Sequence, residues 1–406
     1  MTEMLRILFV DDEPHILKGL RRSMAGMDDE WDMTFCTSGE EALAVMQRDA
    51  TFDVVISDMR MPRMDGAEFL GVVRQRHPET IRVILSGYAE IESVLRTVGP
   101  AHIYLAKPCS AEALRDAISR PISLKRLLST PSLRSVLAGL SNLPSLPGLF
   151  LQLDQELRSP QCSAQTVAAL IDRDVAMTAE LLRLTNSAYF SVASPVTSTL
   201  QVVRTIGLET VQALVLQIGI FRQFAGSASV GPILQGLTDY SLAIANLAEA
   251  ISVSMGTDQS KAKAAHCAAM LSRIGILVLL DAYPEVYARL LSGGGTALPL
   301  HQAEEEAFGA SHALVGAYLL GLWGFAPPLV EAVAFAGTPS ACPGHDNDTL
   351  TALHAAMGLG PALSALMPVE IQSATALDMA YLIEARRDGQ VMLWRRLAAN
   401  SPGETR

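Results

Sequence analysis

Five polar residues stand at the ends of apolar runs near the start of the chain. They are Asp11 and Asp12 after "LRILFV", Asp58 at the end of "FDVVISD", Ser86 at the end of "IRVILS" and Lys107 in "HIYLAKP". Clustered carboxylates repel one another, and a hard divalent cation such as Mg²⁺ holds them together most readily. One carboxylate could then attack phosphorus, while a lysine and a hydroxyl bind the phosphoryl oxygens. These residue types therefore predict phosphoryl-transfer chemistry, provided that the fold gathers them.

The elements that must position these residues alternate between strand and helix. Apolar runs at 5–10, 52–58, 81–86 and 102–108, with a shorter one at 32–36, are typical of parallel strands covered on both faces. Helical patterns separate them. The alternation predicts a doubly wound α/β domain with a five-stranded parallel sheet, whose ligand site lies at the carboxyl ends of the strands. Any one of the polar residues could be an ordinary strand-end residue, but their common position favours a site.

Four motifs in this region resemble a known family. "FVDDEP", "VVISDMRMPRMDG", "ILSGY" and "YLAKP" are similar to the response-regulator receiver domain of two-component signalling, over residues 1–120. The resemblance implies that Asp58 accepts the phosphoryl group. It also implies that Asp12 and Asp58 bind Mg²⁺ directly, with the carbonyl of Arg60, and that Asp11 binds it through water. Lys107–Pro108 would then be a cis peptide bond.

The same resemblance implies roles for the residues around the phosphoryl group. Ser86 and Lys107 would bind it, Tyr104 would be the switch aromatic, and Arg60 and Tyr88 would flank the path of the hydrolytic water and tune the rate of dephosphorylation. Phosphorylation would act by population shift, favouring a conformer in which Tyr104 packs inward. The face formed by residues 89–119 would then change its contacts.

The composition favours a soluble, cytoplasmic protein. Half of the 406 residues are hydrophobic, but no run of about 18 apolar residues occurs, so we expect no membrane insertion. The five cysteines are scattered and form no CxxC, which fits a reducing compartment and argues against structural zinc. A formal net charge of −11 argues against nucleic acid as a partner.

The residues after 120 show mainly helical patterns. Residues 121–140 indicate a partly helical linker, 141–339 an all-α helical domain and 340–406 a helical extension, with one helix expected over 259–283. "RLTNSAYF" and "FGASHALVGAYLLGLWGF" resemble the HDOD domain, between Leu143 and Pro339. That family is related to the metal-dependent HD phosphohydrolases and is mostly regarded as noncatalytic. The resemblance implies no cofactor in this domain.

An HD phosphohydrolase needs histidines and aspartates that hold one or two metals and activate a water. Other residues occupy the aligned positions here: Tyr240 for an early histidine, Ser272 and Arg273 for the His-Asp dyad, Ala336 and Gly337 for a later histidine pair, and Met357 for the last aspartate. Arg273 would also repel a cation, because a guanidinium keeps its charge. We therefore expect no enzyme activity beyond phosphorylation and dephosphorylation of the receiver.

Arg273 also raises a question of packing, because it lies within the apolar run "AAMLSRIGILVLL". A charge there must reach solvent or an acidic partner, for which Asp281 and a glutamate of "AEEEAF" are candidates. His266, His312 and His354 belong to the same helical region but form no HxxxH or HxxE pair. We do not expect them to bind metal, and we expect His312 to be structural.

The leading hypothesis is a phosphorylation-controlled response regulator whose HDOD domain binds a partner protein. A cognate sensor histidine kinase would phosphorylate it. The output partner stays open, and an enzyme of cyclic di-GMP turnover or a chemotaxis-type protein is suggested by family analogy alone. The receiver could also form a homodimer. The alternative is a phosphorylation-regulated HD-type cyclic di-GMP phosphodiesterase, which metal analysis of the purified protein would distinguish.

Overall fold

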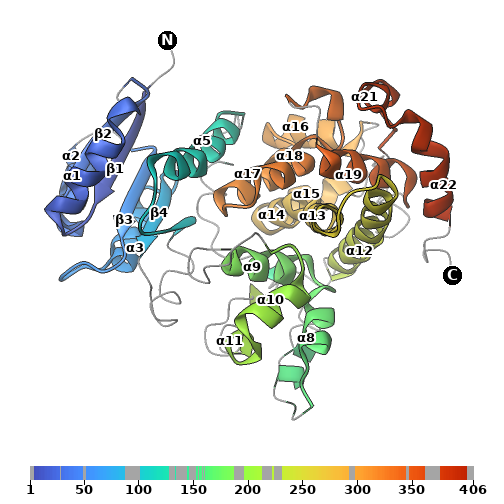
Figure 1. Ribbon diagram of the computed structural model, residues 1–406, viewed down its shortest axis with the longest axis horizontal. Helices are drawn as coiled ribbons and strands as arrows, with labels where there is room; N and C mark the ends of the chain where they lie inside the picture. Colours follow the sequence, from blue (N-terminus) through green and yellow to red (C-terminus); the bar gives the residue numbers. More distant parts are fainter. Residues whose placement is uncertain are drawn as a thin grey trace.

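The computed structural model describes most of both predicted domains. The described residues are 4–27, 29–48, 52–86, 101–127, 133, 144–145, 152–153, 155–157, 159, 161–186, 196–212, 222–223, 231–291, 298–343, 347–361 and 375–399. An N-terminal α/β domain lies beside a larger helical domain (Figure 1).

The α/β domain contains a five-stranded parallel sheet with the order β2-β1-β3-β4-β5. Its strands are β1 (Leu5–Val10), β2 (Trp31–Cys36), β3 (Val54–Asp58), β4 (Ile81–Ser86) and β5 (Ile103–Ala106). Its described helices are α1 (Pro14–Ser23), η1 (Ala25–Met27), α2 (Gly39–Arg48), α3 (Gly66–Arg76) and α5 (Ala111–Leu127). The predicted parallel α/β sheet is confirmed. Residues 87–100 lie outside the described part of the chain.

The central strands are mostly apolar because both faces of the sheet are covered. In β1, Ile7 and Phe9 belong to one buried cluster, whereas Leu8 and Val10 belong to another. The side chains of a strand alternate between faces, so two cores need two sets of apolar residues. The parallel register pairs Val10 with Ser57. It therefore brings the acidic residues that follow β1 next to the end of β3.

The second domain is helical, as predicted. Its helices are α8 (Ala164–Ile171), α9 (Val175–Thr185), α10 (Thr199–Ile206), α11 (Leu208–Gln212), α12 (Gly231–Ser254), α13 (Gln259–Leu271), α14 (Ile274–Ala282), α15 (Pro284–Leu291), α16 (Leu300–Phe308), α17 (His312–Leu322), α18 (Pro327–Phe335), η3 (Pro339–Ala341), α19 (Asp348–Leu359), α21 (Met379–Glu384), η4 (Asp388–Gln390) and α22 (Val391–Ala399). Two-residue strands β6 (Pro144–Ser145) and β7 (Arg222–Gln223) pair with each other. Helices α12, α13, α18 and α19 pack together at the centre of this domain.

The apolar run at 268–280 contains a turn between two helices, which corrects the single helix expected over 259–283. Helix α13 ends at Leu271 and α14 begins at Ile274, so Ser272 and Arg273 lie between them. The segment 259–282 is long and apolar enough to cross a membrane, but 83% of an apolar stretch of 18 residues within it is buried inside the protein. Such burial is typical of core helices in a soluble protein.

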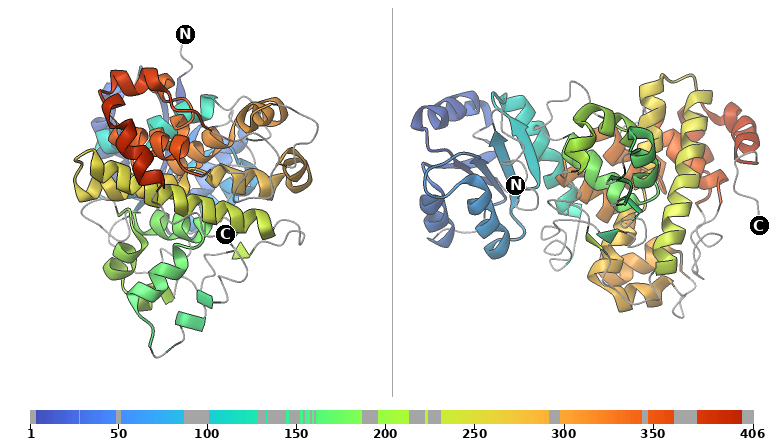
Figure 2. Two further views of the ribbon diagram at one scale, coloured as in Figure 1. Left: turned by 90° about the vertical axis from the view of Figure 1, so that its right-hand side faces the viewer. Right: turned by 90° about the horizontal axis from the view of Figure 1, so that it is seen from below.

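Helix α5 connects the two domains. It continues to Leu127, beyond the boundary expected at residue 120, and it packs against α17 of the helical domain (Figures 1 and 2). Through α5, the α/β domain is therefore in direct contact with the helical domain. The predicted domain boundaries, at residues 120, 140 and 339, stay predictions.

The C-terminal extension completes the helical core. Helix α19 packs on α12 and α13, and α22 packs on α12 and α19. Trp394 on α22 is fully buried, and its indole N–H donates to Ser254 Oγ at 3.0 Å. The described residues after 340 therefore belong to the same packed unit as the helices before them.

Candidate functional site

The carboxyl ends of β1, β3 and β5 bring three predicted residues into contact. Lys107, which follows β5, has its Nζ 2.6 Å from Asp11 Oδ2 and in contact with Asp58 Oδ1. The side chain of Asp11 is 3% exposed, whereas that of Lys107 is 26% exposed. One ammonium group thus bridges two carboxylates from different strand ends, and it can be reached from solvent.

Burial dominates the electrostatics of Asp58. It raises the pKa of this carboxyl above the usual value, and the hydrogen bond from Lys107 offsets only part of that effect. Burial by itself would lower the pKa of Lys107, but its bonds to Asp11 and Asp58 raise the pKa above the usual value. The lysine is therefore held protonated. Ionised Asp58 would be stabilised by additional positive charge.

Close backbone contacts fix the chain around Asp58. The Arg60 N–H donates to Asp58 Oδ2 at 2.7 Å. Gly66, the first residue of α3, approaches so closely that a Cβ at this position would lie 2.2 Å from the carbonyl oxygen of Asp58. Only glycine allows that approach. The Lys107–Pro108 peptide bond is cis, which confirms the prediction from "YLAKP".

The remaining residues predicted at this site are described in part. The register of β4 and β5 places Ser86 beside Ala106, the residue before Lys107. The backbone of Ser86 therefore lies at the same edge of the sheet as the acidic residues. The side chains of Ser86 and Tyr104 lie outside the described residues, as does the whole of Tyr88. Their predicted roles stay predictions.

The donor chemistry of this edge fits a hard cation. Asp11 and Asp58 lie on either side of one ammonium group, and Asp12 is half-buried next to Asp11. Carboxylates and backbone carbonyls, such as that of Arg60, are the oxygen ligands that Mg²⁺ prefers. Among the described residues, no three metal-ligating side chains converge on one point. Lys107 lies between two of the carboxylates instead.

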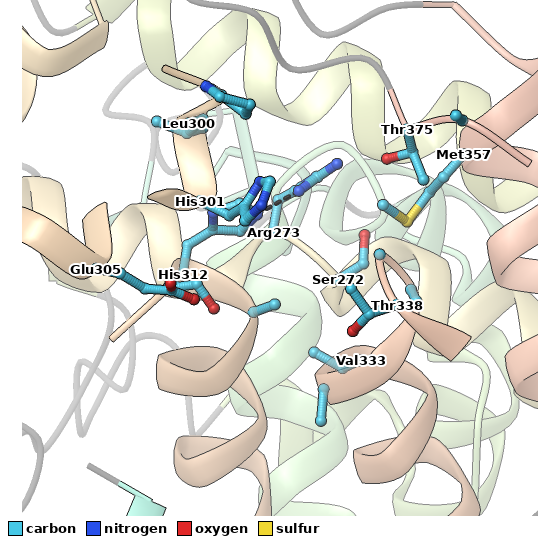
Figure 3. Close-up of a pocket in the computed structure, with 17 residues that line it drawn as sticks. Ser272, Arg273, Leu300, His301, Glu305, His312, Val333, Thr338, Met357 and Thr375 are labelled. Carbon is cyan, nitrogen blue, oxygen red and sulfur yellow. Dashed lines mark hydrogen bonds between the residues drawn. The ribbon is translucent and has the colours of Figure 1, made fainter. Parts of the chain in front are cut away.

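A second cluster of predicted residues meets in the helical domain. Five of the six positions aligned with HD metal ligands line one cavity of about 300 Å³ (Figure 3): Ser272, Arg273, Ala336, Gly337 and Met357. Tyr240, the sixth, lies on α12 with its ring centre 5.4 Å from the guanidinium carbon of Arg273. Its hydroxyl accepts a hydrogen bond from Arg273 Nη2 at 3.3 Å. The structure therefore brings all six positions together.

Arg273 begins a chain of buried hydrogen bonds. Its Nη1 donates to His312 Nε2, and His312 Nδ1 donates to Glu304 Oε2 at 2.6 Å. The hydroxyl of Tyr287 donates to Glu304 Oε1. Burial raises the pKa of Tyr287, and the charge of Glu304 adds to that effect, so this hydroxyl keeps its proton. These directions assign the His312 proton to Nδ1 and leave a neutral imidazole between two opposite charges.

Two family models match this sequence, the response regulator receiver domain over residues 7–119 and the HDOD domain over residues 143–339. The chain is a response regulator with an HDOD domain. Its α/β domain is the receiver. The sheet that gathers Asp11, Asp58 and Lys107 lies within the first match, and the cavity around Arg273 lies mainly within the second.

Among curated proteins, HoxA, a hydrogenase transcriptional regulatory protein of Cupriavidus necator, is 35% identical over 123 residues, which is 30% of this chain and 25% of HoxA. An uncharacterized protein of Treponema pallidum is 26% identical over 208 residues, which is 50% of this chain and 39% of that protein. This chain thus spans between a quarter and two fifths of the length of these two relatives.

Two solved structures resemble larger parts of the chain. The MmoQ response regulator of Methylococcus capsulatus is 22% identical and covers 63% of this chain and 98% of its own, with a TM-score of 0.46. A virulence factor of Campylobacter jejuni is 21% identical and covers 72% of this chain and 99% of its own, with a TM-score of 0.47.

His266, His312 and His354 each have different hydrogen-bond or ion-pair partners. His354 is buried, where its Nδ1 donates to the Ala336 carbonyl and its Nε2 accepts the Asp378 N–H, both at 2.8 Å. Burial lowers its pKa, which keeps the ring neutral. His266 Nδ1 lies 3.1 Å from a carboxylate oxygen of Glu249. His312 is bonded within the core, which fits the structural role expected for it.

Several residues of the cavity were missed by the sequence interpretation. Leu300 and His301 at the start of α16 line it, as do Thr338 and Thr375. The run "AEEEAF" did name Glu304 among the candidate partners of Arg273, but the contact passes through His312 rather than directly. A single sequence carries no signal for a partner that is reached through a third residue.

Proposed function

We propose that this protein is a phosphorylation-controlled response regulator in which Asp58 accepts a phosphoryl group and the HDOD domain binds a partner protein in the cytoplasm. The contact of Lys107 with both Asp11 and Asp58 at the strand ends is the observation that carries the proposal. A carboxylate beside a fixed ammonium group can attack phosphorus, and the ammonium group can then pair with the new phosphoryl oxygens.

In this mechanism an Asp58 oxygen attacks the phosphorus of the kinase phosphohistidine, and the histidine leaves. Asp11, Asp12 and Asp58 would hold a Mg²⁺ ion, and that ion would supply positive charge to the transferring phosphoryl group. Phosphorylation makes Asp58 more negative and adds acceptor oxygens. Lys107, which already touches Asp58, then exchanges part of its bond with Asp11 for the phosphoryl group.

In this proposal, the effect of phosphorylation reaches the HDOD domain through β5 and α5. A cavity of about 250 Å³ lies between the two domains, with Leu105 of β5 and Ala117 of α5 on one side and Trp323 and Phe325 after α17 on the other. The guanidinium carbon of Arg183 lies 5.0 Å from the centre of the Trp323 ring, which connects this boundary to α9. Loosely filled space at a boundary permits the small helix shifts that switches use.

For the HDOD domain we propose binding rather than catalysis. A permanently charged guanidinium in the dyad position disfavours a metal, and the other five aligned positions carry no carboxylate or imidazole. A phosphorylation-regulated cyclic di-GMP phosphodiesterase would need metal ligands there. The output partner, and whether it is itself a cyclic di-GMP enzyme, would be identified by the pull-down described below.

Incubation with acetyl phosphate and Mg²⁺ tests the receiver proposal. We expect an alkali-labile gain of one phosphoryl group in the wild type, detected by intact mass, and its loss in Asp58→Asn. Asp32→Asn changes an exposed carboxylate on β2 and serves as a matched control that should retain labelling. Labelling of Asp58→Asn at the wild-type level would refute the assignment.

Two experiments test whether phosphorylation controls the HDOD domain: one measures binding of a partner protein, and the other measures a change at the boundary between the domains. An affinity pull-down with phosphorylated wild type and with Asp58→Asn should retain a protein in a phosphorylation-dependent manner. Hydrogen exchange of α5 and α17 should change in the same comparison, since these helices are in contact. Equal exchange and equal partner binding in both samples would contradict phosphorylation control.

A further inference from the structure

The cavity around Arg273 contains the buried guanidinium group of this residue, and one of its hydrogen-bond donors has no partner among the described residues. The side chain of Arg273 is directed across the cavity, between His312 on one side and Thr375 and Met357 on the other (Figure 3). Arg273 is only 5% exposed, and its Nε–H has no hydrogen-bond partner among the described residues. We infer that this cavity binds a small phosphate-bearing anion, with Arg273 as the principal contact.

The neighbours of Arg273 do not neutralise it directly. Its two Nη atoms bond to the neutral imidazole of His312 and the hydroxyl of Tyr240. The carboxylate of Glu304 is reached only through His312. A buried guanidinium without a carboxylate in contact is costly, so an anion that enters the cavity and contacts the guanidinium relieves that cost.

Helix ends add to the positive potential of this cavity. Within the described part of the HDOD domain, α14, α16 and α17 all begin at its wall, with Arg273, Pro299 and Ser311 as their N-cap residues. Neither Arg273 nor Pro299 caps its helix with a side-chain hydrogen bond. Helix N-termini carry partial positive charge and favour anions. At α17 the N–H of His312 already donates to Glu304 Oε2 at 2.8 Å, so the uncapped starts of α14 and α16 are the ones open to a ligand.

The other lining groups suit a phosphate ester rather than a free cation. The hydroxyl-bearing residues Thr338 and Thr375 line the cavity near Met357, which supplies apolar surface. Glu305 also lines it but is exposed, where water screens its charge. Donors from several directions match a tetrahedral oxyanion, and the volume of about 300 Å³ accommodates a small organic group beside it.

This site is separate from the phosphorylation of Asp58, so each can fail without the other. Phenyl phosphate is a suitable probe, with inorganic phosphate and benzoate for comparison. Titrations use the full-length protein in EDTA, which prevents Mg²⁺-dependent binding at the receiver. We expect phenyl phosphate to bind saturably at one site below about 10 mM, and at least about tenfold more tightly than benzoate. Asp58→Asn should bind it like the wild type.

Two arginine variants locate the site. Arg273→Lys keeps the charge but removes the guanidinium edge, and it should weaken phenyl phosphate binding about tenfold or more. Arg183→Lys changes a buried arginine of the same domain that does not line this cavity, and it should bind as the wild type does. Unchanged affinity in Arg273→Lys would overturn the inference.

Hydrogen exchange of the wild type gives an answer that needs no variant. Phenyl phosphate should slow exchange in peptides that contain the starts of α16 and α17 and residues 336–338. Protection confined to receiver peptides, or no saturable binding of either phosphate probe, would overturn the proposed site. Equal binding of benzoate would overturn the choice of phosphate and assign a carboxylate ligand instead.

Discussion

The receiver site and the HDOD cavity are both organised around one cation, but they use it differently. Lys107 lies at a sheet edge, partly exposed, and bridges two carboxylates. Arg273 is buried, and it is connected to the carboxylate of Glu304 only through a neutral histidine. The receiver thus has more negative charge than its lysine neutralises, and ligands can change that balance. In the HDOD domain the charges hold helices together, so changing them should affect folding first.

Both sites also depend on a glycine that lies against a backbone carbonyl. Gly66 approaches the carbonyl of Asp58, and Gly275 approaches that of His312, where an added Cβ would lie 2.0 Å from the oxygen. In each case the glycine sets how closely a helix can approach the residue that carries the chemistry. The following predictions test how far the two sites differ.

The largest effect is expected for Arg273→Met, which should destabilise the HDOD domain by about 3–5 kcal/mol because it leaves Glu304 buried without its opposite charge. Urea unfolding followed by far-ultraviolet circular dichroism measures the change. Glu304→Gln in the same chain should recover part of the loss, since both charges are then absent. Strictly additive costs for the two substitutions would contradict the histidine-mediated pairing.

Gly275→Ala should cost about 3 kcal/mol, because the new methyl group forces α14 away from α17. Gly66→Ala should cost a similar amount in the receiver, measured by the same unfolding experiment. Gly71→Ala is the matched control, since it lies in α3 like Gly66 but faces open space. It should stabilise the protein by about 0.5–1 kcal/mol. Equal effects of all three would refute the close approaches.

Asp58→Asn should stabilise the receiver in the absence of Mg²⁺, by an amount on the order of 1 kcal/mol. Burial raises the pKa of Asp58 in the folded state, so its ionised form is disfavoured at neutral pH. The wild-type receiver should therefore gain stability from this residue as the pH falls through the raised pKa towards 3.8. Hydrogen exchange of receiver peptides measures the change, and a loss of protection in Asp58→Asn would contradict it.

The smallest effect concerns His354. Its contribution to stability falls as the pH falls, whereas that of Asp58 rises. Its pKa is lowered by burial, so its contribution is complete above the unfolded pKa of 6.5 and is lost as the pH falls. Between pH 7.5 and 6 the loss should stay below about 1 kcal/mol. His354→Gln should show a flatter dependence of unfolding free energy on pH. A slope identical to that of the wild type would show that His354 does not titrate on unfolding.

The sequence by itself determined the parallel sheet of the receiver and the edge of that sheet at which three of the predicted residues meet. Apolar runs of strand length, each followed by a polar residue, predict a parallel sheet and also the edge at which its ligands meet. Asp11, Asp58 and Lys107 meet there because parallel strands end at one edge, whatever the details of packing. The cis bond before Pro108 was implied by the resemblance of "YLAKP" to the receiver family.

In the helical domain the sequence identified which positions belong together, but only the tertiary structure decided what they do. Periodicity missed the turn at Ser272 and Arg273, because α13 and α14 are both buried and the apolar pattern continues across the break. Arg273 bonds to His312, which lies 39 residues further along the chain, and that contact depends on how α14 packs against α17. Long-range packing sets such partners, so the cavity and its buried charges appear only in the folded chain.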